Sequence, residues 1–342
     1  MMHYFSSVIS KFKRKRILVI GDIILDRYIQ GSVSRISPEA PVPVVVEERC
    51  FHTIGGAANV AHNLSSLDSK VIQVGRIGAD TDGRTLIQDL KEKGIETTGV
   101  FVDKNIPTVT KTRIIAQHQQ VVRVDREDCR ACADPKINDK IINFIQKKID
   151  SVDAIIISDY GKGMITSNLV SFICSLAIQK GKIITVDPKI EHFNYYKNVT
   201  AITPNKKELE NAVTDLNFQS DGTEILNIKP NKLKTTEDID IAAKQILRLL
   251  EPDALLVTLG EDGMRLFEKG RKPFSIKTQA REVYDVSGAG DTVIAVFTLA
   301  LTTGADKKDA ARLANLAAGI VVGKIGAVAI GKNELLRAIK EM

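Results

Sequence analysis

The sequence contains little cysteine and no long apolar run, and each shortage excludes a class of protein. Four cysteines in 342 residues cannot form a framework of disulfides, so we expect a protein of the reducing cytoplasm. The most apolar stretch, residues 313–322, is interrupted by Asn315 and is shorter than the roughly 20 residues that a helix needs to span a bilayer. We therefore expect no association with a membrane.

Two of the cysteines, Cys129 and Cys132, form a CxxC motif. No second pair or nearby histidine completes a tetrahedral zinc site, and no βαβ pattern follows directly, as a redox motif would require. The spacing therefore favours two incidental thiols in a loop before a helix.

Positive charge is also limited, because the formal net charge is only +6. The one dense basic run, residues 11–16, directly precedes an apolar strand, and no second basic stripe with interleaved aromatics supports it. We therefore expect no nucleic-acid partner and interpret residues 1–15 as a basic, solvated N-terminal extension. Phosphorylated ligands explain the remaining positive surplus better.

Two common nucleotide-binding signatures are missing. The stretch from Gly319 to Lys324 has too few residues between its glycines for a P-loop and lacks Ser or Thr after the lysine. The turn at Gly288 lacks the third glycine and the preceding buried strand of a dinucleotide fingerprint. These absences disfavour a P-loop enzyme and a dehydrogenase.

Apolar runs and helical patterns alternate along the rest of the chain. This rhythm predicts one α/β domain over residues 16–342, with a mostly parallel sheet and helices on both faces. The expected strands are 17–20, 71–74, 154–157, 183–186 and 254–257, and the expected helices are 57–67, 83–93, 137–149, 167–179, 206–213, 239–250, 292–301 and 307–324.

Two stretches break the alternation, because they are rich in β-branched residues with no helix between them. They predict a small antiparallel β lid from about residues 27–50 and 99–125. Such a sheet has edges and an apolar face that need cover, so it would close over a ligand or pair with a second subunit. We therefore expect a homodimer formed through the lid strands.

The strongest local signal is Gly288, Ala289, Gly290 and Asp291, which directly precede an apolar helix. Small residues there let a phosphate approach the free N–H groups of the first helical turn, so this segment predicts an anion hole. Asp291 could cap the helix, but it is also suited to take a proton from an attacking hydroxyl.

A second glycine pair, Gly55 and Gly56, opens the helix that carries Asn59. The pair could be only a tight entry turn, or it could present Asn59 to a ligand. Asp22 and Asp26 follow the first strand, and ligands of open α/β sheets bind beyond the carboxyl ends of strands. Their carboxylates suit sugar hydroxyls, although either could simply cap a turn.

Together these motifs resemble the ribokinase-like (PfkB) carbohydrate kinases, from about Arg16 to near the C-terminus. Within them the match narrows to the D-glycero-D-manno-heptose 7-phosphate kinases. The stretches that carry this resemblance are residues 22–28, 34–43, 111–120 and 158–163.

The resemblance implies phosphoryl transfer from ATP to the anomeric hydroxyl of heptose 7-phosphate. The product would be the 1,7-bisphosphate, on the route to ADP-heptose for lipopolysaccharide cores. Many members are fused to a C-terminal adenylyltransferase. Because this chain stops at Met342, we expect it to perform the kinase step alone. The alternatives are a kinase for another sugar phosphate or a nucleoside, and a regulatory sugar-phosphate binder.

The resemblance also assigns roles to residues. It implies Asp291 as the base and Gly288, Ala289 and Gly290 as the anion hole. Glu208 would act on Mg²⁺ indirectly, through water. The implied ATP-binding residues are Asn205, Lys206, Lys207, Glu208, Thr258, Gly260, Gly263 and, beside the adenine, Asn315. The implied sugar-binding residues are Asp22, Asp26, Gly55, Gly56, Asn59, Lys111, Arg113 and Lys189.

The second phosphate of such a substrate needs cations. The candidates are Arg27, Arg35, Lys111, Arg113, Lys162 and Lys189. Lys189 could equally serve the transferring phosphoryl group, and Arg27 and Arg35 could be ordinary surface or lid residues. One departure from the family is the long polar stretch 218–235, which we expect to be a surface loop near the nucleotide.

Overall fold

The computed structural model describes residues 2–117, 119–128, 134–218, 233–280, 282–324, 326 and 328–341. Cys129, Cys132 and most of the polar stretch 218–235 lie outside these residues, so the predictions about them stay predictions.

The main sheet has nine strands in the order β13-β12-β11-β10-β9-β8-β1-β4-β5. All neighbours are parallel except β11, β12 and β13, which are antiparallel to one another in turn. The strands are β1 (Arg16–Gly21), β4 (Lys70–Gly78), β5 (Glu96–Asp103), β8 (Ala154–Ser158), β9 (Ile183–Asp187), β10 (Ala201–Ile202), β11 (Ala254–Thr258), β12 (Met264–Glu268) and β13 (Phe274–Ile276).

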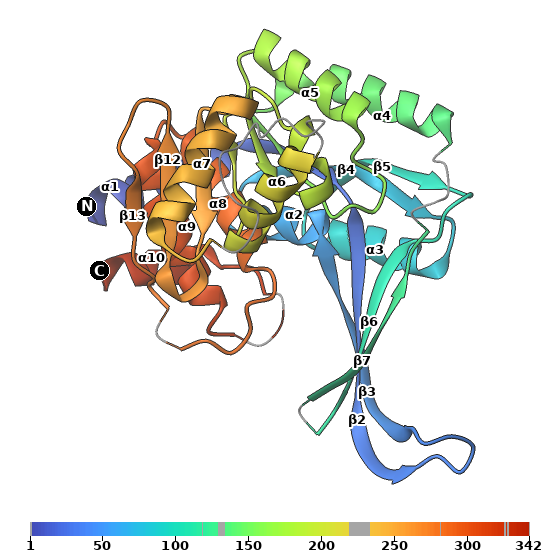
Figure 1. The fold of residues 1–342 in the computed structure, drawn as a ribbon. Coiled ribbons are helices and arrows are strands. Elements are labelled where there is room, and N and C mark those ends of the chain that lie inside the picture. Colours follow the sequence, from blue (N-terminus) through green and yellow to red (C-terminus); the bar gives the residue numbers. More distant parts are fainter. Residues whose placement is uncertain are drawn as a thin grey trace.

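Helices cover both faces of this sheet, and each face has its own cluster of buried side chains (Figure 1). One cluster includes α1 (Met2–Ser10), α2 (Ala57–Ser66), α3 (Thr81–Glu92), α8 (Ala289–Thr302), α9 (Lys307–Val321) and α10 (Lys332–Lys340). The other includes α4 (Pro135–Lys148), α5 (Ser167–Gln179), α6 (Lys206–Phe218) and α7 (Thr236–Leu250). The predicted α/β architecture is confirmed.

The N-terminal segment is more than the solvated extension that its basic run indicated. Phe5, Val8, Ile9 and Phe12 recur at helical spacing and are buried in the main core, where α1 contacts α10. The basic residues Lys11, Lys13 and Arg14 are exposed, as is the opposite side of α1, for example at Tyr4. The apolar stripe was present in the sequence, but the adjacent charges masked it.

A second sheet, which we call the lid, projects from the main body in the order β3-β2-β6-β7 (Figure 1). Its strands are β2 (Ile23–Ile36), β3 (Pro43–Gly56), β6 (Val109–Ala116) and β7 (Gln119–Arg126). They form two antiparallel hairpins joined by a parallel pairing of β2 with β6.

The second segment of the lid therefore begins later than the predicted residue 99, at Val109, because β5 belongs to the main sheet. β5 pairs in parallel with β4, and α3 forms the crossover between them. The composition of β5 suits either sheet, since β propensity reports a half-buried pleated surface and not a particular partner.

Candidate active site

Asp291 is held from outside its own helix. It is the third residue of α8, whose N-cap Gly288 has a φ of 78°, and it is only 5% exposed. The side-chain amide of Asn59 donates to its Oδ2 at 2.7 Å, and the hydroxyl of Tyr160 donates to its Oδ1 at 2.7 Å. The carboxylate therefore receives hydrogen bonds from α2 and from the loop after β8, both outside its own helix. These contacts favour the catalytic interpretation over the capping one.

The environment of Asp291 suits a general base. Its pKa is raised to about 6, and burial is the largest cause. The hydrogen bonds from Asn59 and Tyr160 and the charge of Lys111 oppose this rise, whereas the charge of Asp26 adds to it. At neutral pH the carboxylate is therefore mostly ionised, yet its proton affinity is well above that of an ordinary aspartate. A pKa near the working pH is what proton transfer favours.

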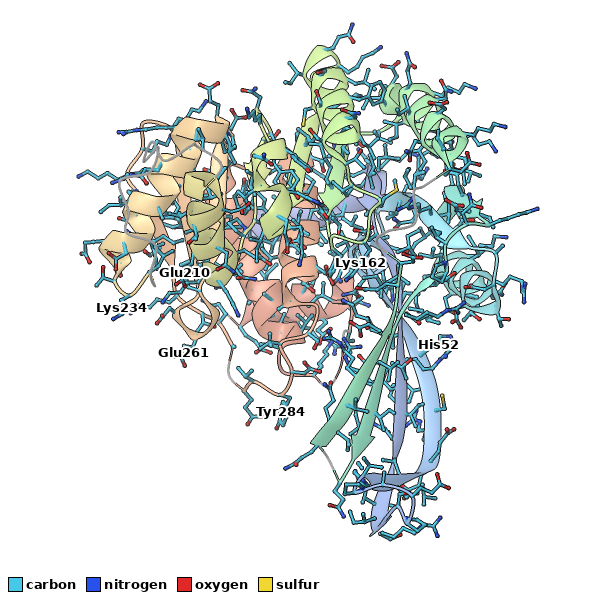
Figure 2. The ribbon with its side chains drawn as sticks, turned by 45° about the vertical axis from the view of Figure 1, so that its right-hand side comes forward. His52, Lys162, Glu210, Lys234, Glu261 and Tyr284 are labelled. Atoms are coloured by element: carbon cyan, nitrogen blue, oxygen red, sulfur yellow. The ribbon has the colours of Figure 1, made fainter. Side chains whose placement is uncertain are left out.

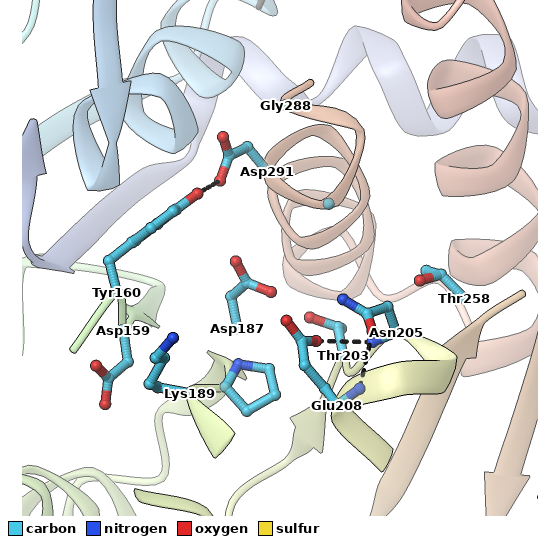
Figure 3. Close-up of a pocket in the computed structure, with 12 residues that line it drawn as sticks. Asp159, Tyr160, Asp187, Lys189, Thr203, Asn205, Glu208, Thr258, Gly288 and Asp291 are labelled. Atoms are coloured by element: carbon cyan, nitrogen blue, oxygen red, sulfur yellow. Dashed lines mark hydrogen bonds between the residues drawn. The ribbon is translucent and has the colours of Figure 1, made fainter. Parts of the chain in front are cut away.

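A pocket of about 300 Å³ opens beside Asp291 (Figure 3). It combines several predicted groups, namely the base, the glycine turn, the segment that starts α6, the end of β11, and Lys189. The lining residues are Asp159, Tyr160, Asp187, Pro188, Lys189, Thr203, Asn205, Glu208, Thr258, Gly288, Gly290 and Asp291.

Asn205 and Glu208 form a reciprocal cap at the start of α6. The backbone N–H of Asn205 donates to Glu208 Oε2 at 2.8 Å, and the N–H of Glu208 donates to Asn205 Oδ1 at 2.9 Å. These two residues, which we predicted to bind ATP, therefore also stabilise the start of α6. Burial raises the pKa of Glu208, and burial together with the charges of Glu208 and Asp291 raises that of Asp187 well above its ordinary value. With Asp159, four carboxylates line this pocket, which favours a ligand that brings positive charge.

Lys189 lines the same pocket, two residues after Asp187 (Figure 3), and its charge lowers the pKa of Glu208. Its stem packs on Gly161, where an added Cβ would lie 3.1 Å from Lys189 Cε and where φ is +66°. The ammonium is 3.8 Å from the Glu191 carboxylate. At that distance the pairing is loose, so the ammonium can turn to an anion in the pocket.

Asp22 holds a loop. Its carboxylate accepts hydrogen bonds from the backbone N–H groups of Tyr160 at 3.0 Å, Lys162 at 3.2 Å and Met164 at 3.0 Å. Its predicted contact with sugar hydroxyls stays a prediction.

Other predicted sugar-site residues gather between the lid and Asp291. Asp26 pairs with Arg113 at 2.5 Å, and the ammonium of Lys111 lies 5.4 Å from the centre of the Tyr160 ring. The structure explains why both positions are glycine. A Cβ at Gly55 would lie 2.0 Å from Asp26 Oδ2, and Gly56 has a φ of +59°, which other residues rarely adopt.

Several predicted ATP residues do not line this pocket. Asn315 donates to the carbonyl of Lys277 at 2.8 Å. Gly260 and Gly263 form the turn between β11 and β12, and Lys206 and Lys207 lie in the first turn of α6. Their roles stay predictions.

Four residues that line the pocket were not predicted as site residues from the sequence, namely Asp159, Tyr160, Asp187 and Thr203. A signal existed, because Asp159 and Tyr160 directly follow β8 and Asp187 ends β9. The strand-end rule that selected Asp22 applies to all three.

The described residues contain no group of three His, Cys, Asp or Glu side chains that could hold a metal ion directly. No helix among them is long and apolar enough to cross a membrane.

The profile of the pfkB family of carbohydrate kinases matches residues 14–333. The chain belongs to this family. As a pfkB family member it is an ATP-dependent carbohydrate kinase, so the predicted family and enzyme class are confirmed.

This pfkB kinase is 42% identical to the bifunctional protein HldE of Desulfatibacillum aliphaticivorans over 333 residues, 97% of this chain and 65% of that protein. It is also 42% identical to the HldE of a Helicobacter pylori strain over 321 residues, 94% of this chain and 65% of that protein. The chain thus spans about 65% of the length of these relatives.

Solved structures show the same fold at low sequence identity. Ribokinase of Arabidopsis thaliana, complexed with ribose and ATP, superposes with a TM-score of 0.73 at 19% identity, covering 95% of this chain and 98% of that one. Phosphofructokinase-2 of Escherichia coli gives 0.74 at 16% identity, covering 96% and 98%. The predicted ribokinase-like fold is confirmed.

Proposed function

We propose that this pfkB kinase phosphorylates the anomeric O1 of D-glycero-D-manno-heptose 7-phosphate, giving the 1,7-bisphosphate for ADP-heptose and lipopolysaccharide core synthesis. The observation that carries the proposal is the buried carboxylate of Asp291 between an anion-binding helix start and a cationic lid. The 42% identity to the HldE proteins supports the choice of heptose. The four cysteines suit the cytoplasm as the place of action.

In the proposed reaction, Asp291 takes the proton of the anomeric hydroxyl as O1 attacks the γ-phosphorus of ATP. The O1–phosphorus bond forms, the bond from phosphorus to the β–γ bridging oxygen breaks, and its electron pair leaves with ADP. N–H groups in the first turn of α8 and the ammonium of Lys189 stabilise the negative charge of the transferring group.

The donor set fits Mg²⁺ bound with the nucleotide. Mg²⁺ keeps several waters and needs only one or two carboxylates besides phosphate oxygens. Glu208 offers the carboxylate oxygen that its cap does not use, and would act through water. When bound, the ion neutralises charge on the phosphates.

Lys111 is our proposed ligand for the 7-phosphate. Among the six candidate cations, Arg27 pairs with Asp82, Arg113 with Asp26, and Lys162 with Glu127. Within the described residues no carboxylate lies within ion-pair distance of Lys111. Burial lowers its pKa, as do the charges of Lys162, Arg123 and Arg113, although the charge of Asp26 opposes them. A half-buried ammonium among other cations gains from a dianion beside it.

Lys162 supports the same location. It lies where the lid leaves the main body (Figure 2). A phosphate at this junction would sit between the lid and the loop that carries Tyr160, with O1 of the sugar directed toward Asp291.

An acceptor panel tests the substrate. Heptose 7-phosphate, unphosphorylated heptose, other sugar phosphates and a nucleoside are incubated with Mg·ATP, and ADP release is measured. We expect heptose 7-phosphate to give the highest kcat/KM. A better nucleoside or another sugar phosphate would overturn the assignment, and no turnover of any acceptor would favour a regulatory binder.

Lys111→Met tests the phosphate contact, with Lys104→Met, in an exposed turn, as the matched control. Losing a charge-assisted contact should raise KM for heptose 7-phosphate about 10- to 100-fold. KM for ATP and the KM of unphosphorylated heptose should change little. An equal loss with both sugars would contradict the assignment.

We also propose a homodimer formed through the lid. Val46, Val121, Val122 and Val124 are exposed large hydrophobic residues on the lid strands, and such a surface favours association. Light scattering at micromolar concentration should give twice the chain's mass, and Val122→Asp should halve it. A monomeric wild type would refute the dimer.

A further inference from the structure

The loop after β8 is fixed at both ends. Asp22 accepts three of its backbone N–H groups, and Asp159 Oδ1 accepts the N–H of Gly161 at 2.8 Å. Asp159 Oδ2 in turn accepts the hydroxyl of Tyr196 at 2.6 Å and lies 2.7 Å from His192 Nδ1. A loop restrained in this way presents its side chains in a fixed geometry.

The side chain that this loop presents to the base is Tyr160. Its hydroxyl lies 2.7 Å from Asp291 Oδ1 (Figure 3). Burial, and then the charge of Asp291, raise the pKa of the phenol well above its ordinary value. The phenol therefore stays protonated and donates to the carboxylate.

We propose that Tyr160 is the positioning residue of the general base: its hydroxyl fixes Oδ1 of Asp291 and keeps the carboxylate ionised until the acceptor hydroxyl arrives. This inference rests on the proposed role of Asp291. Asn59 fixes the other oxygen from α2. Since each carboxylate oxygen has two lone pairs, the two bonds orient the group and still leave it able to accept a proton.

The other groups that face Asp291 set the background for this contact. Lys111 of β6 lowers its pKa and Asp26 of β2 raises it, while the charge of Asp291 in turn helps to raise the pKa of Asp187 at the end of β9. Removing the phenol hydroxyl leaves all of these in place. The change should therefore report the Tyr160 contact alone.

Tyr160→Phe is the direct test, with kcat/KM measured against pH. A lost donor to an ionised carboxylate should move the acid limb upward by about one to two pH units, because the charged form is less favoured. Tyr284→Phe is the control, since it removes a hydroxyl that donates to a different carboxylate, that of Glu282, away from this loop. It should leave the acid limb unmoved.

A second readout needs no turnover. In protein labelled with ¹³C at aspartate carboxyl groups, the resonance absent from Asp291→Asn reports the titration of Asp291. It should shift upward in Tyr160→Phe. If it shifts while Asp291→Asn still turns over, the contact stands and the proposed base role fails. If neither this titration nor the acid limb moves, the inference is overturned.

Replacing Tyr160 with 3-fluorotyrosine covers the case in which the Phe variant does not fold. Fluorine makes the phenol a stronger donor at nearly constant size, so the acid limb and the ¹³C titration should move to lower pH. An upward shift or no shift in a folded fluorotyrosine protein would equally refute the role of Tyr160.

Discussion

Replacing Asp291 with Asn should abolish most of the turnover and at the same time stabilise the fold. The amide cannot take the proton, so we expect kcat to fall about 10²- to 10⁴-fold. The fold should tolerate the amide. Asn59 Oδ1 has no hydrogen-bond partner within the described structure, so a flipped Asn59 amide can accept from the new Asn, whose oxygen still accepts from Tyr160.

The size of the stabilisation follows from the pKa. Burial raises the pKa of Asp291 from its ordinary 3.8 to about 6. At pH 7.5 the ionised carboxylate therefore costs about 3 kcal/mol in the free energy of unfolding, at 1.36 kcal/mol per unit. Because the folded-state pKa is the higher one, wild-type stability falls as pH rises from 3.8 to 6. The variant avoids that cost, so its advantage should be full above pH 6 and vanish below about pH 4.

Denaturant unfolding of both proteins between pH 4 and 8 measures this difference, alongside ADP release at pH 7.5. Asp285→Asn is the matched control, because the pKa of Asp285 is lowered where that of Asp291 is raised. Burial raises the pKa of Asp285, but hydrogen bonds from Ser287 and Gly326 outweigh it and lower the pKa. That variant should be less stable than wild type at pH 7.5. An Asp291→Asn protein that is less stable at pH 7.5, or an advantage independent of pH, would refute the burial argument; near-normal turnover would refute the base.

Two further predictions concern the fold around the site. Gly55→Ala should lower stability by about 1–3 kcal/mol and raise KM for the sugar, because its Cβ would lie 2.0 Å from Asp26 Oδ2; an unchanged melting curve and KM would contradict it. Phe5→Ala should cost about 3–5 kcal/mol as a buried core truncation, whereas Tyr4→Ala, at a residue 43% exposed, should stay within about 0.5 kcal/mol. Equal effects in denaturant unfolding would show that α1 is not part of the core.

The parts of the site that the sequence predicted are those written in local patterns. Asp291 was predicted because it follows small residues at a helix start. Asn205 and Glu208 were implied by the family resemblance, and the structure shows that they also form a reciprocal cap. The part it could not predict depends on contacts between distant segments. Nothing in the sequence around Asp22 indicates that its carboxylate accepts hydrogen bonds from backbone N–H groups of the loop after β8.

The fold divides in the same way. Continuous apolar runs predicted the buried parallel strands, because only strands covered on both faces need them. The assignment of β5 could not be predicted from its composition, since its β-branched residues suit an edge of either sheet. The start of the lid's second segment was therefore misplaced, while the existence of a small, mostly antiparallel second sheet was predicted correctly.

One chain of contacts joins the lid to the base. Lys111 of the lid lies over the ring of Tyr160, the Tyr160 hydroxyl binds Asp291, and the charge of Lys111 itself lowers the pKa of Asp291. A phosphate dianion bound beside Lys111 would offset that charge and raise the proton affinity of the carboxylate. An anionic acceptor would thus make Asp291 a stronger base once it is bound. A neutral sugar in the same pocket would leave the base weaker, so the cation that recognises the substrate would also favour its reaction.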